Sequence, residues 1–374
     1  MRKTINKTSF KTALAELGWT QGQLATEVGT SSQAVTNWLK GKDFPRPPTL
    51  LKLATTLKLT FEQLVEQDNK SRPIVAFRKK GSAKTTSEHI TKATEMGMLL
   101  KPLVPYLPEM QVLRTLITSP SIDYNKLQMA ASQTRDRLGL GSMTALEYDH
   151  LIKEFKNCGA VLTPVLWGEQ KQHKNALHIR LPIEDVTFIW VNLDTRLEDF
   201  KFWMTHELAH VYTPDLAGTD EGEDYADAFA GALLFPQACA KKAYDEAIKQ
   251  TTEKEKIKIL DKYSEEHSIS LNTVFQQIKE YVNAMKLTSL NISEKVIHIT
   301  RNSNHSRLVS ETLFDPMPPN AKHYIAACEN VFQSGFFTAL KRMIHEKEIG
   351  DSYIQQALDT SFMDAKAIYE EIRH

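Results

Sequence analysis

A pair of histidines four residues apart is the feature that most constrains how this chain can fold. His206 and His210 stand in the segment WMTHELAHVY at residues 203–212. Positions i and i+4 of a helix share one face, so both imidazoles can bind a single metal ion there. Glu207 then lies beside the place of a metal-bound water, where its carboxylate can act as general base. The alternative is an ordinary amphipathic helix, but the complete H-E-x-x-H pattern is rare by chance.

A catalytic zinc also needs a third protein ligand and an open position, and a downstream acidic segment can supply the ligand. Residues 221–235 read EGEDYADAFAGALLF, with Glu223 and Asp227 on one side of a predicted helix. We predict that Glu223 is the third ligand. Asp227 can accept a hydrogen bond from the far nitrogen of a ligating histidine. The alternative, acidic residues attracted to a helix N-terminus, accounts better for Asp220, Glu221 and Asp224.

The residues around these motifs predict an α+β domain. Three segments rich in β-branched and aromatic residues, 160–168, 176–182 and 186–192, are typical of strands. Helices are expected at about 198–213 and 221–235, the second ending at Pro236.

An oxyanion formed during peptide hydrolysis would need a hydrogen-bond donor. Tyr212, Tyr225 and His178 are candidates, and the sequence does not decide between them. We expect His173 and His178 to be surface or strand residues rather than metal ligands.

The combined pattern resembles the ImmA/IrrE family of metallopeptidases over roughly residues 130–285. The family is marked by H-E-x-x-H, then an acidic residue ahead of A-[ND]-x-F-A and L-L-x-P. Here these read HELAH and EDYADAFAGALLFP. The resemblance implies a zincin-like domain with Zn²⁺ bound by His206, His210 and Glu223, and with Glu207 catalytic. It also implies a repressor of the Xre type as protein substrate.

Two departures from the ImmA/IrrE pattern concern the rim of the expected cleft. Ala209 stands where the family has glycine before the second histidine. The segment VYTPDLAG follows His210 in place of an apolar run. We therefore expect a different rim but the same metal ligands.

The N-terminal segment 5–67 reads as five short helices joined by small polar turns. Helices over 20–28 and 31–40, joined at Gly29, predict a helix-turn-helix whose second helix enters the major groove of DNA. Its expected DNA-binding residues carry amide, hydroxyl or ammonium groups for base edges and phosphates. They are Gln21, Ser32, Gln33, Thr36, Asn37, Lys40 and Lys42.

This segment resembles the Cro/C1-type (Xre) helix-turn-helix of phage repressors. The resemblance rests on TQGQLATEVGTSSQAVTNWLKGK, followed by PPTLLKLATTLKL, and implies binding to double-stranded operator DNA. Leu39 departs from the family, which carries an acidic residue before the Gly-Lys turn. The alternative is a helical bundle of the same shape that binds only protein.

Charge distribution agrees with an anionic partner for the N-terminal end. The whole chain balances 46 Lys and Arg against 46 Asp and Glu, whereas residues 1–95 contain 16 against 8. The three cysteines form no CxxC pair, which suits a reducing cytoplasm. No apolar run reaches 18 residues, so we expect no membrane span.

The remaining segments complete a multidomain architecture. We predict an all-α helix-turn-helix domain at 5–67, a linker at 68–86, a metallopeptidase domain with a helical lead-in at 87–286, and a mostly helical region at 287–374. That last region begins with a strand-like KVIHITR at 295–301 and includes a long helix at 323–344. It could cap the peptidase domain, form a homodimer or bind a partner.

The sequence therefore predicts a DNA-binding transcriptional regulator with a zinc-dependent endopeptidase domain. Its substrate would be a repressor-type protein or the chain itself. The alternative is a non-proteolytic transcription factor or antitoxin-like repressor, whose metallopeptidase-like domain senses a ligand, a metal or a partner. A third hypothesis is an unrelated zinc hydrolase with a protein-docking N-terminal domain.

Overall fold

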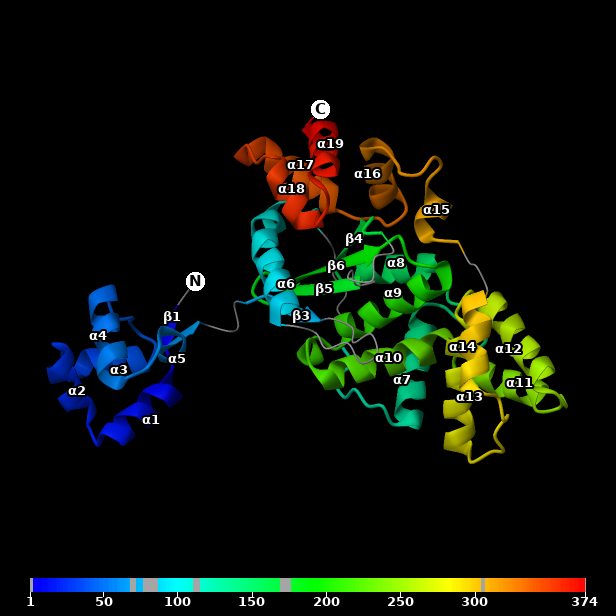
Figure 1. Cartoon of the computed structure of the whole chain (residues 1–374), viewed down its shortest axis with the longest axis horizontal. Coiled ribbons are helices and arrows are strands. Elements are labelled where there is room, and N and C mark those ends of the chain that lie inside the picture. The colour runs from blue at the N-terminus through cyan, green and yellow to red at the C-terminus, as the bar shows by residue number, and fades with distance from the viewer. Residues whose placement is uncertain are drawn as a thin grey trace. The chain divides into compact units, whose positions relative to one another are not determined.

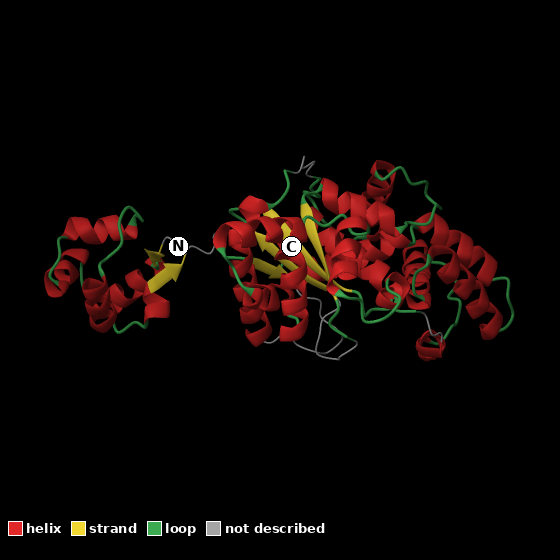
Figure 2. Cartoon of the chain, turned by 90° about the horizontal axis from the view of Figure 1, so that it is seen from above, coloured by secondary structure: helices red, strands yellow, loops and turns green. Residues whose placement is uncertain are grey.

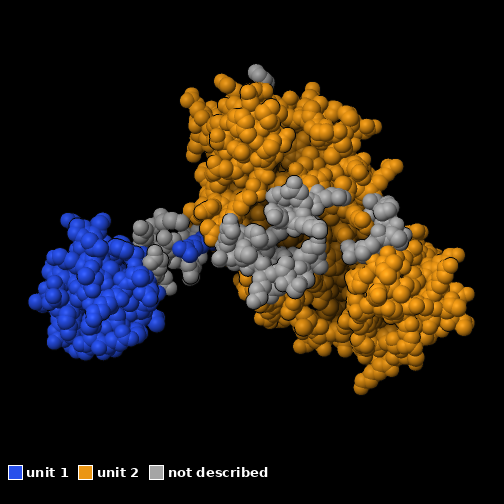
Figure 3. Space-filling view, in the orientation of Figure 1, with its two compact units in different colours: residues 1–72 blue, residues 73–374 orange. Residues whose placement is uncertain are grey.

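The computed structural model of the chain describes residues 3–67, 72–76, 87–109, 115–168, 176–303 and 307–373. The chain divides into two compact units, Met1–Arg72 and Pro73–His374 (Figure 3). Within the described ranges, no helix combines the length and the apolar character needed to cross a bilayer.

The first unit is a bundle of short helices around its own apolar core. Thr20 and Gln23 form a capping box at the start of α2, and Gly29 ends that helix in the left-handed conformation. Phe10, Leu24, Val35, Leu53 and Leu64 are fully buried in the core. The elements are β1 (Lys3–Ile5), α1 (Lys7–Leu17), α2 (Gln21–Val28), α3 (Ser32–Leu39), α4 (Pro47–Leu57), α5 (Phe61–Leu64) and β2 (Val65–Gln67).

The fifth predicted helix is shorter than expected. Thr60 and Gln63 form the expected capping box, but α5 ends at Leu64. Residues 65–67 instead pair antiparallel with β1, and the Asn6 N–H donates to the Leu64 carbonyl. The ordered domain thus begins before residue 5, because a strand near the N-terminus pairs with a segment about 60 residues away.

The second unit is built on a four-stranded sheet with the order β3-β5-β6-β4. Only β4 and β6 are parallel, and the other neighbours are antiparallel. Figure 2 shows these strands with helices on both sides of the sheet. The strands are β3 (Ile74–Ala76), β4 (Ala160–Val165), β5 (Ala176–Leu181) and β6 (Val186–Asn192).

Helices of the second unit pack around this sheet (Figure 1). Those before the sheet's last strand are α6 (Ser87–Leu100), the 3₁₀ helix η2 (Lys101–Tyr106), α7 (Tyr124–Arg137) and α8 (Tyr148–Asn157). Those after it are α9 (Leu197–Tyr212), the 3₁₀ helix η3 (Pro214–Leu216), α10 (Asp220–Leu234), α11 (Gln237–Ala247), α12 (Glu253–His267) and α13 (Leu271–Met285). The strands β4, β5 and β6 and the two helices around the motifs thus lie where the sequence predicts them.

The expected linker at 68–86 contains a strand of the sheet. Residues 74–76 form β3, and the unit boundary lies between Arg72 and Pro73. Three residues with a Pro before them gave too short a pattern to indicate a strand, and their pairing partner lies about 100 residues downstream. The other parts of the expected linker, 68–71 and 77–86, lie outside the described residues.

The C-terminal region shares the core of the second unit. The Trp190 indole N–H donates to the Ala357 carbonyl at 3.1 Å, and the Tyr324 hydroxyl donates to the Pro164 carbonyl at 2.5 Å. These bonds attach the C-terminal helices to β6 and β4, so the region covers one part of the sheet. Its helices are α14 (Glu294–Ser303), α15 (Val309–Leu313), α16 (Ala321–Asn330), α17 (Phe336–Lys347), α18 (Asp351–Leu358) and α19 (Phe362–Arg373).

Two expectations for this region are wrong. The strand-like segment 295–301 is helical, with Ile297 fully buried and Ile299 58% exposed, so the core contacts one helical face. The long helix expected at 323–344 is two helices, because residues 331–335 turn the chain between α16 and α17. At Gly335 a Cβ would lie 2.9 Å from the Pro108 ring, so the turn passes close to another segment.

Candidate metal centre

Two neighbouring helices carry the predicted ligands. α9 and α10 pack against each other, with Ala209, Ala226 and Ala230 fully buried between larger side chains. Gly222 lets the first turn of α10 lie close to the preceding turn, since a Cβ there would be only 2.1 Å from the Leu216 carbonyl oxygen. This close contact fixes the position of the next residue, Glu223, in the first turn of α10.

His206, His210 and Glu223 converge, each offering one ligand atom within 4.8 Å of the others. The two Nε2 atoms are 3.1 Å apart, His206 Nε2 is 3.5 Å from Glu223 Oε2, and His210 Nε2 is 3.3 Å from Glu223 Oε1. Ligands about 2.0–2.1 Å from a tetrahedral zinc are separated by about 3.3 Å. The spacing of the three side chains therefore fits an ion of this kind.

The polar atoms of this cluster lack partners that would explain their burial. Both carboxylate oxygens of Glu223 and Nδ1 of His210 are buried without a hydrogen bond among the described residues. Buried polar atoms are normally paired, and a bound cation could satisfy the atoms of this cluster. A cation at the meeting point would contact both histidines and the carboxylate.

The pKa values of His206 and Glu223 are shifted by the contacts between the basic and acidic groups of the cluster. Burial lowers the pKa of His206, but contacts with Asp227 and Glu223 outweigh burial and raise the pKa above its usual range. For Glu223, burial raises the pKa, but the contacts with His206 and His210 together outweigh burial and lower the pKa below its usual range. Metal binding at such a cluster would be coupled to the release of protons.

Asp227 contacts one of the two histidines predicted to be metal ligands. Its Oδ1 lies 2.9 Å from Nδ1 of His206, one turn of α10 after Glu223. A proton on Nδ1 then leaves the Nε2 lone pair directed towards the other two ligand side chains.

Replacing Asp227 with alanine should lower zinc affinity by about 10- to 100-fold, because the ligating imidazole loses its orienting partner. Competition with a chromogenic chelator would measure the change. Asp224→Ala, an exposed carboxylate on the same helix, is the matched control. Equal zinc affinity of the two variants would contradict the role of Asp227.

Glu207 lies on the same helix with its carboxylate buried. The side chain is 3% exposed, and Oε2 has no hydrogen bond among the described residues. His178 from β5 brings Nδ1 within 3.3 Å of that oxygen. Burial lowers the pKa of His178, against the opposing effect of Glu207. A buried carboxylate beside the proposed metal ligands can accept a proton from water.

The structure separates the three candidates for stabilising an oxyanion. His178 lies at the site, with its ring edge-on to His210 at a centroid distance of 5.6 Å. Tyr212 donates its hydroxyl to Glu154 Oε1 at 2.7 Å and is thereby engaged elsewhere. Tyr225 stacks on Phe229, and its buried hydroxyl has no partner among the described residues.

The place of His178 beside Glu207 was not predicted, although the sequence contained a signal for it. Alternation along β5 directs His178 and Arg180 to one face and Ile179 to the other. Only the packing of α9 on β5 shows which of these faces meets the metal ligands. His173 lies outside the described residues.

A small hollow reaches the cluster beside His210. Its volume is about 40 Å³, and Thr115, Arg180, Asp185 and Thr187 are among its lining residues. A water needs roughly 10–15 Å³ of such space and several polar partners. The hollow therefore has room for solvent next to the ligand cluster.

Gln21 begins α2, the predicted residues Ser32, Gln33, Thr36 and Asn37 lie along α3, and Lys40 and Lys42 follow the end of α3. Ser32, Gln33, Lys40 and Lys42 are exposed, whereas Gln21, Thr36 and Asn37 are partly buried. Gln33 Nε2 donates to Asn37 Oδ1 at 3.0 Å, which aligns two amides one turn apart. A Cβ at Gly22 would lie 3.6 Å from Ser32 Oγ, so the starts of the two helices are adjacent.

The burial of Leu39 explains why the chain departs from the repressor pattern at this position. Its side chain is 9% exposed and belongs to the core of the first unit, next to Trp38 in sequence. An acidic residue at this position would be buried, so the apolar residue fits this packing.

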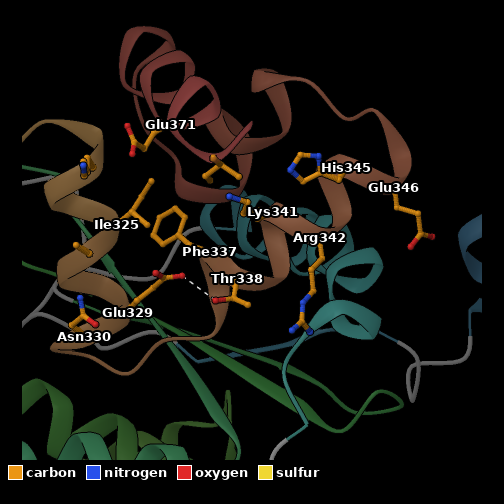
Figure 4. A pocket seen from close by; sticks show the side chains of 13 residues that line it. Ile325, Glu329, Asn330, Phe337, Thr338, Lys341, Arg342, His345, Glu346 and Glu371 are labelled. Carbon is orange, nitrogen blue, oxygen red and sulfur yellow. Dashed lines mark hydrogen bonds between the residues drawn. The ribbon is translucent and has the colours of Figure 1, made fainter. Parts of the chain in front are cut away.

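A second and larger hollow lies among C-terminal helices (Figure 4). Its volume is about 800 Å³, and none of its lining residues belongs to the metal cluster. Ile325, Phe337 and Ile372 give it apolar walls, and its lining contains both basic and acidic residues, among them Lys322, Lys341, Glu329 and Glu371. Figure 4 shows the Thr338 hydroxyl bonded to Glu329 at 2.9 Å beside these residues.

Comparison with known families identifies the first unit. Residues 10–64 match the family model described as Helix-turn-helix, which spans α1 to α5. The chain therefore contains a Cro/C1-type helix-turn-helix and is a DNA-binding transcription regulator. No curated protein matches the chain.

Proposed function

We propose that this regulator carries a zinc-dependent endopeptidase of the ImmA/IrrE type in its second unit. The observation that supports the proposal best is the convergence of His206, His210 and Glu223 at zinc-ligand spacing. Their burial, their unpaired atoms and the buried carboxylate beside them fit a catalytic metal better than a surface ion.

When bound, zinc would act as a Lewis acid and lower the pKa of a coordinated water. The two histidines and Glu223 would bind the ion, and Asp227 would orient His206 through Nδ1. Glu207 would take a proton from the attacking water and pass it to the leaving amide nitrogen. His178 lies close enough to contact either Glu207 or the developing oxyanion.

The helix-turn-helix suggests what the peptidase cuts. A DNA-binding unit on the same chain would bring the peptidase to an operator, where repressors of related type also bind. The substrate of this proposal is therefore an Xre-type repressor or the chain itself. The test is a metal count by mass spectrometry on protein purified without added zinc, together with cleavage assays against repressors encoded by neighbouring genes. Metal-free protein that never cuts any of them would refute the proposal.

Operator recognition is proposed to rest on α3. Gln33→Ala should weaken binding to the cognate operator by about 1–3 kcal/mol and relax specificity at one base pair. Lys42→Ala should weaken binding to all sequences and reduce the salt-dependence slope by about 1. Fluorescence anisotropy at several salt concentrations measures both effects. Lys11→Ala, an exposed lysine on α1, is the control, and an equal loss in all three variants would refute this assignment.

A second candidate function is ligand-dependent transcription regulation without proteolysis. The hollow of about 800 Å³ among α16, α17 and α19 favours it, since small-molecule sites in proteins commonly have about 300–1,000 Å³. Operator binding measured with and without a chelator distinguishes the two functions. If chelation changes operator affinity while no repressor is cut, the sensing function is favoured.

A further inference from the structure

The strand that carries His178 has its outer edge covered by the first strand of the second unit. β5 pairs with β6 on one side and with the three-residue β3 on the other. The antiparallel register sets Ile74 opposite Arg180 and Ala76 opposite His178. The far edge of the sheet, β4, is separated from β5 by β6. We call the side of β5 that pairs with β3 the β5 edge. Apart from β3, it is the sheet edge nearest to Glu207.

β3 lies in a narrow slot between two other elements. A Cβ at Gly97 of α6 would lie 2.5 Å from the Pro73 side chain. A Cβ at Gly218, in the connection from α9 to α10, would lie 2.9 Å from the Val75 carbonyl oxygen. Ala76 is 1% exposed. The connection between the two ligand-bearing helices therefore contacts the backbone of β3 directly.

An extended peptide at this edge would lie beside the general base. Residues directly opposite each other in an antiparallel pair have Cβ atoms about 4.5–5.5 Å apart. His178 in turn lies 3.3 Å from Glu207. The residue in the position of Ala76 is therefore one side chain away from the carboxylate. Extended peptides commonly bind proteins by adding a strand to a sheet edge, with main-chain hydrogen bonds giving the affinity.

We infer that the β5 edge is where an extended substrate segment binds, and that β3 occupies this edge as a built-in surrogate. The inference rests on the proposed peptidase function. The substrate class is a protein segment able to form a strand antiparallel to β5, with a small residue opposite His178. Such a segment must displace β3 before it can pair with β5, so β3 inhibits substrate binding in the resting chain.

A peptide-binding experiment tests this without relying on turnover. The probe is a fluorescein-labelled synthetic peptide with the sequence of residues 71–79, SRPIVAFRK. Every full-length protein in this experiment carries Glu207→Gln, so that no probe is hydrolysed. Ala76→Pro removes a strand donor and should free the edge. It should bind the probe at least about tenfold more tightly than the parent, because apparent affinity scales with the fraction of open sites.

A reversible lock provides the second variant. Ile74→Cys with Arg180→Cys places a cysteine pair on directly opposed residues, in a Cys158→Ser background that removes a thiol near Arg180. The oxidised protein should bind no probe, and reduction should restore the parental affinity. Each single cysteine variant is the control for loss of a side chain. If Ala76→Pro fails to fold, the oxidised and reduced forms still decide the question.

Equal probe affinity in the parent, the proline variant and the oxidised protein would overturn the inference, as would absence of binding to all of them. Failure of the proposed function has a different signature. Proteins with Glu207 restored would then cut no repressor, whatever the state of β3. If cleavage is seen but is unchanged by Ala76→Pro and by the lock, the peptidase stands and the surrogate strand does not.

Discussion

Replacing Glu207 with glutamine should abolish repressor cleavage while leaving zinc content and operator affinity unchanged. The amide has the same shape but cannot take a proton from water, and general-base catalysis contributes about 10²- to 10⁴-fold to a rate. The buried carboxylate is outside the proposed ligand cluster, so metal binding should persist. Single-turnover cleavage followed by intact-mass spectrometry measures the loss.

The matched control for Glu207→Gln is Glu198→Gln, a glutamate in the first turn of the same helix. It should cleave at the parental rate. Cleavage by Glu207→Gln within twofold of the parent would refute the assigned mechanism. Loss of zinc from Glu207→Gln would instead mean that the residue serves the structure of the site.

Replacing Glu223 with alanine should lower zinc affinity by more than about 100-fold, because the loss of a ligand exceeds the effect of an orienting partner. A ligand present at 100 times its Kd stabilises the native state by about 2.7 kcal/mol. The rise in Tm on adding zinc should therefore be lost in this variant. Differential scanning fluorimetry with a zinc titration measures it.

Glu221→Ala is the control for Glu223→Ala, since Glu221 is exposed in the same first turn of α10. It should retain both the zinc affinity and the rise in Tm. A Glu223→Ala protein that binds zinc as tightly as this control would show that the three side chains do not form the metal site. Operator binding by the first unit should survive in both proteins.

These two variants separate the possible roles of the second unit. If Glu223→Ala loses zinc and also changes operator affinity, while Glu207→Gln changes neither, the metal contributes to regulation without hydrolysis. If both variants lose cleavage and keep operator binding, the metal centre is catalytic.

Much of the site could be predicted because its signals are local. The spacing of His206 and His210 places them on one helical face, and the spacing of Glu223 and Asp227 does the same on the next helix. The capping box of Thr20, the turn at Gly29 and the apolar positions of α2 and α3 likewise follow from neighbours within a few residues.

The features that were missed depend on contacts between distant segments. β1 with β2, and β3 with β5, pair residues 60 or more positions apart, and three residues are too few to show an alternating pattern. The contact between His178 and Glu207 depends on the packing of α9 against one particular face of β5. The segment 295–301 has a β-branched composition that favours a strand. It is a helix because one helical face packs against the core.

The amino-acid sequence alone determined the helix-turn-helix, the strands β4, β5 and β6 and the helical faces that carry the predicted ligand side chains, because backbone periodicity is set by near neighbours. Tertiary structure decided that these two faces meet, which histidine lies beside Glu207, and which strand covers the β5 edge. Burial and strand pairing select one arrangement from many that the local pattern allows.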